Sequence, residues 1–172
     1  MTATRPSTAH LAGRTPGSGP VLAVLTDGPT DMAVAAHAAD LAVRTGTLLI
    51  AAATVAAGSG INPLLLQHTR TRRVHNDTTA IVARITPILH GAGVAYRRST
   101  LLVPAGTDTL RALPVTAVRR LVDRFGAVTV VTARPLRDPT GTLQPADPHT
   151  TPGAYGPTQR AHRATHAAPA PW

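Results

Sequence analysis

The sequence of 172 residues contains no cysteine, no lysine and no glutamate, and aromatic residues make up only 2% of it. Without cysteine the chain has neither disulfides nor thiolates for metal binding or nucleophilic attack. The absence of lysine and glutamate excludes a Schiff-base lysine, a phosphate-binding lysine and a glutamate base. The scarcity of aromatic side chains argues against stacking platforms for single-stranded nucleic acid.

Long hydrophobic runs are also missing. The longest apolar run without a basic residue, residues 47–57, is too short to cross a bilayer, which needs about 20 apolar residues. The N-terminus carries no apolar segment of the kind that a secretory signal requires. We therefore expect a soluble cytoplasmic protein.

The charge is strongly positive and comes from arginine alone. All 17 basic residues are arginine and all 8 acidic residues are aspartate, which gives a net charge of +9. Arginines can bind nucleic-acid phosphates without regard to base sequence. Arginine without lysine, beside abundant alanine, proline, glycine and threonine, is also typical of a GC-rich coding sequence. Sequence-independent binding of nucleic acid or another polyanion is therefore an alternative function rather than the first interpretation.

The large aliphatic residues divide the chain into three parts. Nearly all valines, leucines and isoleucines lie between residues 20 and 135. We predict one α/β domain over residues 20–134, because only this part can bury a core. Residues 1–19 predict a disordered lead, and the proline-rich residues 135–172 predict a disordered tail.

Inside the domain, short apolar runs alternate with helical patterns. Runs bounded by turn residues are typical of strands buried on both faces, and helices show apolar residues at a period of 3.6. Thr30 or Asp31 is expected to cap the first helix and Asn76 or Asp77 the second, Gly46 and Gly126 to end two of the helices, and the third to begin after a break near Pro114. The predicted strands are residues 21–25, 47–55, 94–103 and 127–133, and the predicted helices are residues 32–44, 77–91 and 115–125.

This order predicts a Rossmann-like, three-layer α/β sandwich around a parallel sheet of four strands, or five if another strand follows. Ligands of such sheets bind beyond the carboxyl ends of the strands. In this region the chain resembles the universal stress proteins, over roughly residues 20–133. The resemblance rests on Asp27-Gly28 after the first strand, Arg44-Thr45-Gly46, Gly91-Ala92-Gly93-Val94 followed by Gly106, and the run Gly126–Val131.

The resemblance implies a site for ATP or another adenine nucleotide. Asp27 and Gly28, with Thr54 or Val55, match the positions that contact the nucleoside in that family. The family's phosphate loop, G-x2-G-x9-G-[ST], is missing after the fourth strand, and Arg134 is the residue there that could replace it as a phosphate partner.

The resemblance further implies a non-enzymatic role in stress response or regulation, exercised by assembly or weak ligand binding. The family's fifth strand commonly helps to build a dimer, and here it is missing. Residues 128–132 would then form an open sheet edge. We expect this edge to be covered by a second subunit in a homodimer or by the tail around Ala154-Tyr155.

Other candidate sites carry less weight. Arg70, Arg72 and Arg73 predict a basic loop that could bind anions, and with Arg97-Arg98 they are the candidate nucleic-acid contacts. His162 and His166 have the spacing of metal ligands on a helix, but the prolines around them argue against a rigid helix. His37 and Asp40 share a helix face, where an ion pair of Asp40 with Arg44 is expected rather than a proton relay. No catalytic set is evident, so we do not expect an enzyme.

Overall fold

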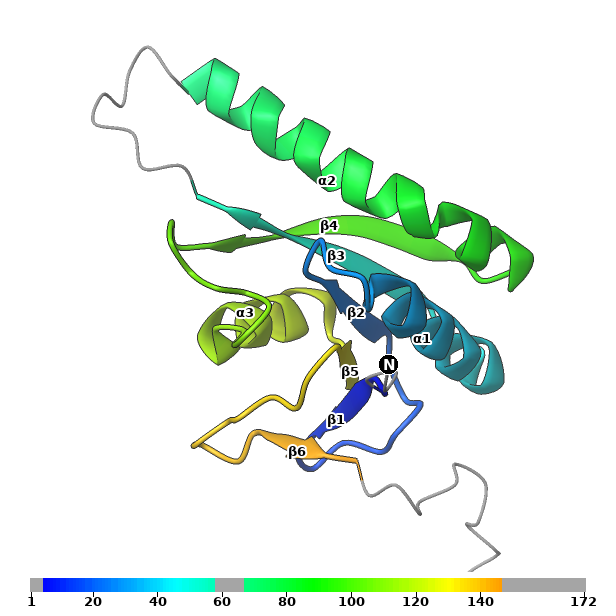
Figure 1. Cartoon of the computed structure of the whole chain (residues 1–172). Helices are drawn as coiled ribbons and strands as arrows, with labels where there is room; N and C mark the ends of the chain where they lie inside the picture. The colour runs from blue at the N-terminus through cyan, green and yellow to red at the C-terminus, as the bar shows by residue number, and fades with distance from the viewer. Residues whose placement is uncertain (1–4, 58–66, 147–172) are drawn as a thin grey trace, which may run out of the picture.

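A parallel sheet of four strands forms the centre of the structure. The computed structural model describes residues 5–57 and 67–146, and for residues 67–70 it describes the backbone alone. The parallel strands are adjacent in the order β4-β3-β2-β5 (Figure 1). The α/β fold and the four parallel strands predicted from the sequence are thereby confirmed. The strands are β2 (Val21–Leu25), β3 (Leu49–Ala56), β4 (Tyr96–Val103) and β5 (Thr129–Thr132).

Helices cover both faces of this sheet. The helices α1 (Asp31–Thr45) and α2 (Gln67–Gly91) pack on one face, and α3 (Val115–Phe125) packs on the other (Figure 1). Alternate residues of β2 point to the two faces: Val21 and Leu25 pack with α1 and α2, whereas Leu22 and Val24 pack with α3. All five residues of β2 are therefore buried, which is why the strand is a continuous apolar run.

Two antiparallel strands extend the sheet beyond β5. The strand β1 (Ser7–Leu11) pairs with β5 on one side and with β6 (Leu143–Pro145) on the other, which completes the six-stranded order β4-β3-β2-β5-β1-β6. The prediction of a disordered lead is therefore wrong for β1, and the prediction of a disordered tail is wrong for β6. The physical reason is that β1 buries one face alone, with Ala9 at its centre, so it lacks the apolar run that marks the other strands.

The strand β1 also covers the β5 edge that the sequence left open. Its register pairs Ser7 with Thr132 and His10 with Thr129. The prediction that a second subunit or the tail covers this edge is wrong, because the chain's own N-terminal strand lies there. The predicted tail contact at Ala154-Tyr155 lies outside the described residues. The predicted homodimer rested on this open edge, so the structure no longer gives a reason to expect it.

The helix ends agree with the sequence at their C-termini and differ at their N-termini. Gly46 and Gly126 follow α1 and α3 in the left-handed conformation, with φ of 65° and 62°, as predicted. Pro114 precedes α3, at the predicted break. Thr30 makes no side-chain cap of α1, and Asp31 does not cap it either, because its carboxylate turns to the backbone N–H of Thr26 instead.

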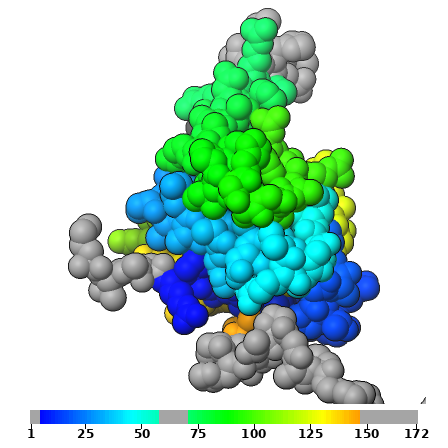
Figure 2. Space-filling model, turned by 90° about the vertical axis from the view of Figure 1, so that its right-hand side faces the viewer, coloured from blue at the N-terminus to red at the C-terminus, as the bar shows by residue number. Residues whose placement is uncertain are grey.

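The helix α2 is longer than predicted, because it begins at Gln67 and not after a cap at Asn76 or Asp77. Its first turns diverge from the sheet (Figure 1) and project from the top of the molecule (Figure 2). The described side chains of residues 71–77 are exposed apart from Val74. This part of the helix therefore lacks the apolar periodicity from which a helix is predicted. Pro87 lies on the exposed side, away from the buried Ile85 and Leu89, as expected.

Candidate functional site

The candidate site lies at the carboxyl edge of the parallel strands. The chain leaves β2 at Leu25, and residues 26–30 cross this edge before α1 begins. Two cavities flank this crossing segment, because Asp27 lines one of them and Thr26, Pro29 and Thr30 line the other. The edge at which ligands of parallel sheets bind is thus hollowed on two sides of one short segment.

The first cavity, here the Asp27 cavity, has a volume of about 330 Å³. Its walls are the end of β3, the segment after β2 and the middle of α2. Three of the predicted nucleoside contacts, Asp27, Thr54 and Val55, lie together in it. Its other lining residues are Ala56, Asp77, Ala80, Ile81 and Arg84.

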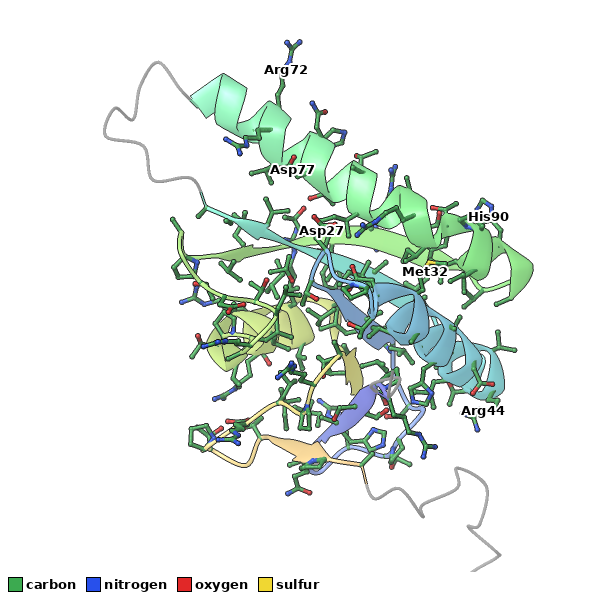
Figure 3. The ribbon with its side chains drawn as sticks, in the orientation of Figure 1. Asp27, Met32, Arg44, Arg72, Asp77 and His90 are labelled. Carbon is green, nitrogen blue, oxygen red and sulfur yellow. The ribbon has the colours of Figure 1, made fainter. Side chains whose placement is uncertain are left out.

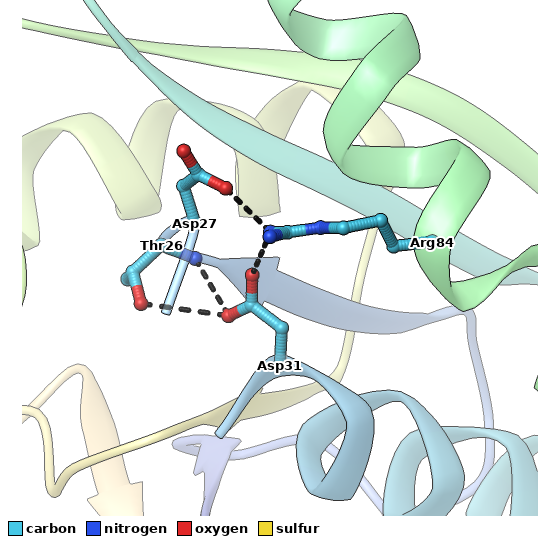
Figure 4. A network of polar contacts seen from close by, with 4 residues as sticks. All are labelled: Thr26, Asp27, Asp31 and Arg84. Carbon is cyan, nitrogen blue, oxygen red and sulfur yellow. Dashed lines mark hydrogen bonds and ion pairs between the residues drawn. The ribbon is translucent and has the colours of Figure 1, made fainter. Parts of the chain in front are cut away.

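An arginine of α2 organises the charged part of this cavity (Figure 4). The Arg84 guanidinium donates to Oδ1 of Asp27 at 2.5 Å and lies 3.5 Å from Oδ2 of Asp31. Asp27 adopts a positive φ of 60°, in the left-handed region that residues other than glycine seldom adopt. The ion pair links this turn, whose backbone conformation is uncommon, to α2.

Asp31 is the buried member of this group. It is 2% exposed, and its Oδ1 accepts hydrogen bonds from the backbone N–H and the hydroxyl of Thr26 at 2.9 and 3.5 Å. Burial raises the pKa of the Asp31 carboxyl above its ordinary value of 3.8, while backbone N–H donors, foremost Thr26, and the charge of Arg84 act in the opposite direction. The first turn of α1 is thereby fastened to the end of β2.

Thr54 lines the cavity at the end of β3, but its hydroxyl does not face α2. The residue is 7% exposed, and its Oγ1 is buried and makes no hydrogen bond within the described part of the chain. Residues of β3 alternate between the two faces of the sheet, and Thr54 lies on the face of Ile50 and Ala52, which pack with α3. The Thr54 hydroxyl therefore points away from the Asp27 cavity, whose helical wall is α2.

The charge of the Asp27 cavity is negative. Among the described residues that line it, two carboxylates, Asp27 and Asp77, face one cation, Arg84, and the buried Asp31 lies behind Arg84. Such a lining favours groups that donate hydrogen bonds, such as an amine or a hydroxyl, over phosphate.

The site contains three residues that the sequence pattern did not predict as its members, Arg84, Asp77 and Asp31. Asp31 was interpreted as a helix cap, and Asp77 as the cap of a helix that in fact begins ten residues earlier. Arg84 lies three residues after Ile81 and one before Ile85, next to the apolar stripe of α2. The position of Arg84 at the border of the apolar stripe of α2 was the sequence signal that could have indicated its role in the site.

The remaining two predicted nucleoside-site residues lie elsewhere. Gly28 is buried behind the segment, where a Cβ would come within 2.9 Å of Leu110 Cδ2; it has a packing role and does not line the Asp27 cavity. Arg134 lines the second cavity, here the arginine cavity, which has a volume of about 840 Å³ and also contains Arg111 and Arg137. The structure thus separates Arg134 from the three residues that it brings together.

The predicted basic loop is a helix, and its arginines are far from the other candidate nucleic-acid contacts. Arg72 and Arg73 are exposed near the start of α2, and the side chain of Arg70 is not described. The other pair, Arg97-Arg98, follows Tyr96, whose ring lies 6.0 Å from that of His90 at the opposite end of α2. Figure 3 shows Arg72 and His90 at the two ends of this helix, so these arginines do not form one surface.

Metal and proton-relay chemistry find no support in the described residues. Residues 5–57 and 71–146 hold no group of three or more histidines and aspartates that could bind a metal ion, and His162 and His166 lie outside the described residues. Asp40 pairs with Arg44 at 2.7 Å, as expected, whereas His37 bonds to Thr8 at 3.0 Å.

No helix in the described part of the chain combines the length and the apolar character that crossing a membrane requires.

Comparisons with known proteins give structural neighbours of one kind. No family model and no curated protein matches the chain. A solved universal stress protein in complex with cAMP is similar with a TM-score of 0.46 and 16% identity, over 66% of this chain and 74% of that one. A protein of the universal stress protein family from Burkholderia pseudomallei is similar with a TM-score of 0.41 and 20% identity, over 66% of this chain and 80% of that one. The structural neighbours of this chain are thus universal stress proteins.

Proposed function

We propose that this chain is a universal-stress-protein-like domain that binds an adenine nucleoside or nucleotide weakly in the Asp27 cavity, as a non-enzymatic component of stress response or regulation. One observation carries the proposal: Asp27 and Val55 line one cavity at the carboxyl edge of the parallel strands. Both are positions at which the family resemblance of the sequence places nucleoside contacts.

The lining of the cavity favours a ligand that has both polar and apolar groups. The carboxylates of Asp27 and Asp77 accept hydrogen bonds from such a ligand. The apolar neighbours Val55 and Ile81 offer contact to a flat base. An adenine or ribose group fits this combination because it carries both apolar area and several hydrogen-bonding atoms.

The negative lining supports a nucleoside, rather than its phosphates, as the group in the cavity. A phosphate group would face Asp27 and Asp77 and would be repelled by both. The ribose hydroxyls and the exocyclic amine of adenine are donors, and carboxylate oxygens are acceptors. We therefore expect adenosine to bind at least as tightly as ATP.

The ion pair between Arg84 and Asp27 is the reason that we expect adenosine to bind weakly. The Asp27 Oδ1 atom already accepts from Arg84, so a ligand that uses this oxygen has to compete with the guanidinium. Both side chains are more than half exposed, and exposed ion pairs contribute little stability. A small ligand can displace this contact at a small cost in free energy, and this cost lowers its net affinity.

Calorimetric titration of the full chain with adenosine, AMP and ATP tests the proposal. We expect Ala80→Leu, which puts a larger side chain into the cavity, to weaken adenosine binding by about fivefold or more, a loss of roughly 1 kcal/mol. Ala80 is exposed on α2, so we expect the free energy of unfolding to change by less than about 0.5 kcal/mol. Weaker binding in a protein of unchanged stability separates a ligand contact from damage to the fold.

Ala83→Leu is the matched control, because Ala83 is exposed on α2 and lies outside the cavity. It is expected to change neither property. Absence of adenosine binding to the unsubstituted chain would overturn the proposal. Binding of ATP that is much tighter than that of adenosine would contradict the placement of the nucleoside beside the two aspartates.

A further inference from the structure

We propose that the outer edge of β4 binds an extended acidic segment of a partner protein, which adds to the sheet as a further strand. No residue of β4 lines the Asp27 cavity, so this interaction goes beyond the proposed nucleoside binding. The strand β4 stands at one end of the sheet order, and among the described strands it pairs with β3 alone. It has eight residues, enough for a ladder of hydrogen bonds, and such edges are templates for pairing with another chain.

The backbone of β4 directs half of its hydrogen-bonding groups away from the sheet. The carbonyl oxygen of Ala95, just before β4, accepts from the backbone N–H of Leu49 at 3.1 Å. At the other end of the strand, the carbonyl oxygen of Val103 accepts from the N–H of Ala57 at 2.7 Å. The odd-numbered residues therefore face β3, and in a parallel pair the residues between them direct their N–H and C=O groups to the opposite side. The residues with outward backbone groups are Tyr96, Arg98, Thr100 and Leu102.

The N-terminal half of this edge is positively charged. Arg97 and Arg98 are exposed, and neither guanidinium makes a hydrogen bond or an ion pair with a described residue. The strand itself contains no acidic residue. Successive side chains of a strand point to opposite faces, so one arginine lies on each face of the sheet. An added strand with two consecutive acidic residues can therefore pair with both.

The C-terminal half of the edge offers an apolar contact. Leu102 is 54% exposed and lies on the same face as Thr100, whose hydroxyl bonds to that of Thr78 on α2. The neighbouring Leu101 and Val103 point to the other face, where they are buried with residues of α3. A partner residue beside Leu102 gains free energy by being apolar, because the contact removes apolar surface from water.

The charge and the backbone together select the occupant. A second copy of this chain would bring the same two arginines and a further net charge of +9 to the edge, and like charges oppose such pairing. Nucleic acid neutralises arginines, but it has no peptide groups with which to continue the ladder. An acidic protein segment supplies the hydrogen bonds of a strand and carboxylates for the guanidinium groups at the same time.

The positions of these side chains define a peptide probe. Antiparallel pairs are slightly more stable and more common than parallel ones. In an antiparallel partner, the residue beside Leu102 comes four positions before the residue beside Arg98. The acetylated and amidated peptide Thr-Val-Thr-Val-Thr-Asp-Asp-Thr therefore places a valine beside Leu102 and its two aspartates beside Arg98 and Arg97.

Titration of the isotope-labelled full chain with this peptide, followed by NMR and amide hydrogen exchange, is the experiment. We expect saturable binding at low salt and slower exchange of the outward N–H groups of Arg98, Thr100 and Leu102. Arg97→Gln and Arg98→Gln should each weaken binding by about threefold, the usual effect of losing an exposed ion pair. Leu102→Ser should weaken binding by about threefold as well, because it removes the apolar contact.

Arg14→Gln is the matched control, because Arg14 is exposed in the segment after β1, and three strands separate β1 from β4 in the sheet. An equal loss in this variant would show that net charge alone acts, and would overturn the proposal. Binding that leaves the exchange of the outward N–H groups unchanged would exclude strand addition. Equal affinity for the peptide with asparagine in place of both aspartates would exclude an acidic occupant.

Oligothymidylate tests nucleic acid as the alternative occupant. A loss of its binding in Arg97→Gln and Arg98→Gln as large as the loss of peptide binding would assign these arginines to nucleic acid and overturn the proposal. No binding of the peptide would overturn it as well. Ala80→Leu should leave peptide binding unchanged, and Arg98→Gln should leave adenosine binding unchanged, so the two proposals can fail independently.

Discussion

Asp31 is the residue on which the geometry of the carboxyl edge depends most directly. Its carboxylate accepts the backbone N–H of Thr26 on one side and contacts Arg84 on the other. Because burial raises its pKa above the ordinary value of 3.8, the folded protein holds a proton there more tightly than the unfolded chain does. Ionisation of this carboxyl therefore costs stability as the pH rises above that value. What the fold needs from Asp31 is an acceptor atom more than a charge.

Two substitutions at this position separate the acceptor from the charge. Asp31→Ala leaves the buried N–H of Thr26 without an acceptor, and we expect it to lower the free energy of unfolding by about 2 kcal/mol. Asp31→Asn keeps an acceptor oxygen and removes the charge, so its effect should be less than about 1 kcal/mol. Urea unfolding followed by circular dichroism measures both. Equal losses in the two variants would mean that the ion pair with Arg84 is the larger contribution.

At the scale of the elements, β1 is held by its pairing with β5 and by two histidines. The Nδ1 atom of His10 lies 3.1 Å from the hydroxyl of Thr129, and the Nε2 atom of His37 on α1 lies 3.0 Å from the hydroxyl of Thr8. Burial lowers the pKa of both histidines from the ordinary value of 6.5. For His37 the charges of Arg44 and Arg5 act in the same direction, and the charge of Asp40 opposes them.

These shifts predict that acid weakens the attachment of β1. A histidine with a lowered pKa binds fewer protons in the folded state than in the unfolded state, so its contribution is complete above pH 6.5 and is lost as the pH falls through the folded value. We expect the free energy of unfolding to decrease between pH 7.5 and pH 5. Chemical unfolding at a series of pH values measures the decrease.

The double variant His10→Gln and His37→Gln is the control for this dependence. It keeps a hydrogen-bonding side chain at each position and removes the titration. Its stability should change less with pH over the same range than that of the unsubstituted chain. An identical slope in both proteins would assign the pH dependence to other groups.

At the scale of the whole molecule, the N-terminal strand β1 covers the edge that β5 would otherwise expose. Removal of residues 1–12 would take away β1 and expose the edge of β5. Open strand edges pair with other chains, so we expect the shortened protein to associate. Size-exclusion chromatography with light scattering measures this as an increase in mass with concentration.

Removal of residues 147–172 is the matched control, since all six strands lie before residue 147. It should leave the mass distribution of the protein as it is. A shortened N-terminal variant that stays at the mass of the full chain would show that the β5 edge is protected by something other than β1.

The sequence by itself determined the parallel centre of this protein. Strands and helices that bury one or both faces have apolar residues at regular spacing in the sequence. For this reason β2, β3 and the apolar stripe of α2 at Ile81 and Ile85 were predictable. The left-handed ends at Gly46 and Gly126 were predictable as well, because glycine is the residue for which this conformation costs least. The meeting of Asp27, Thr54 and Val55 followed from the rule that parallel strands end at one edge.

The tertiary structure decided the contacts between segments that are far apart in the sequence. The strand β1 is half-buried and polar, and it becomes a strand because β5 offers it hydrogen bonds from 119 positions away in the chain, the separation of His10 and Thr129. Arg84 belongs to the site because α2 crosses above the segment after β2, and no local pattern encodes that crossing. The division of the edge into one acidic and one basic cavity arises in the same way, since the opposing charges come from loops and helices that only packing brings together.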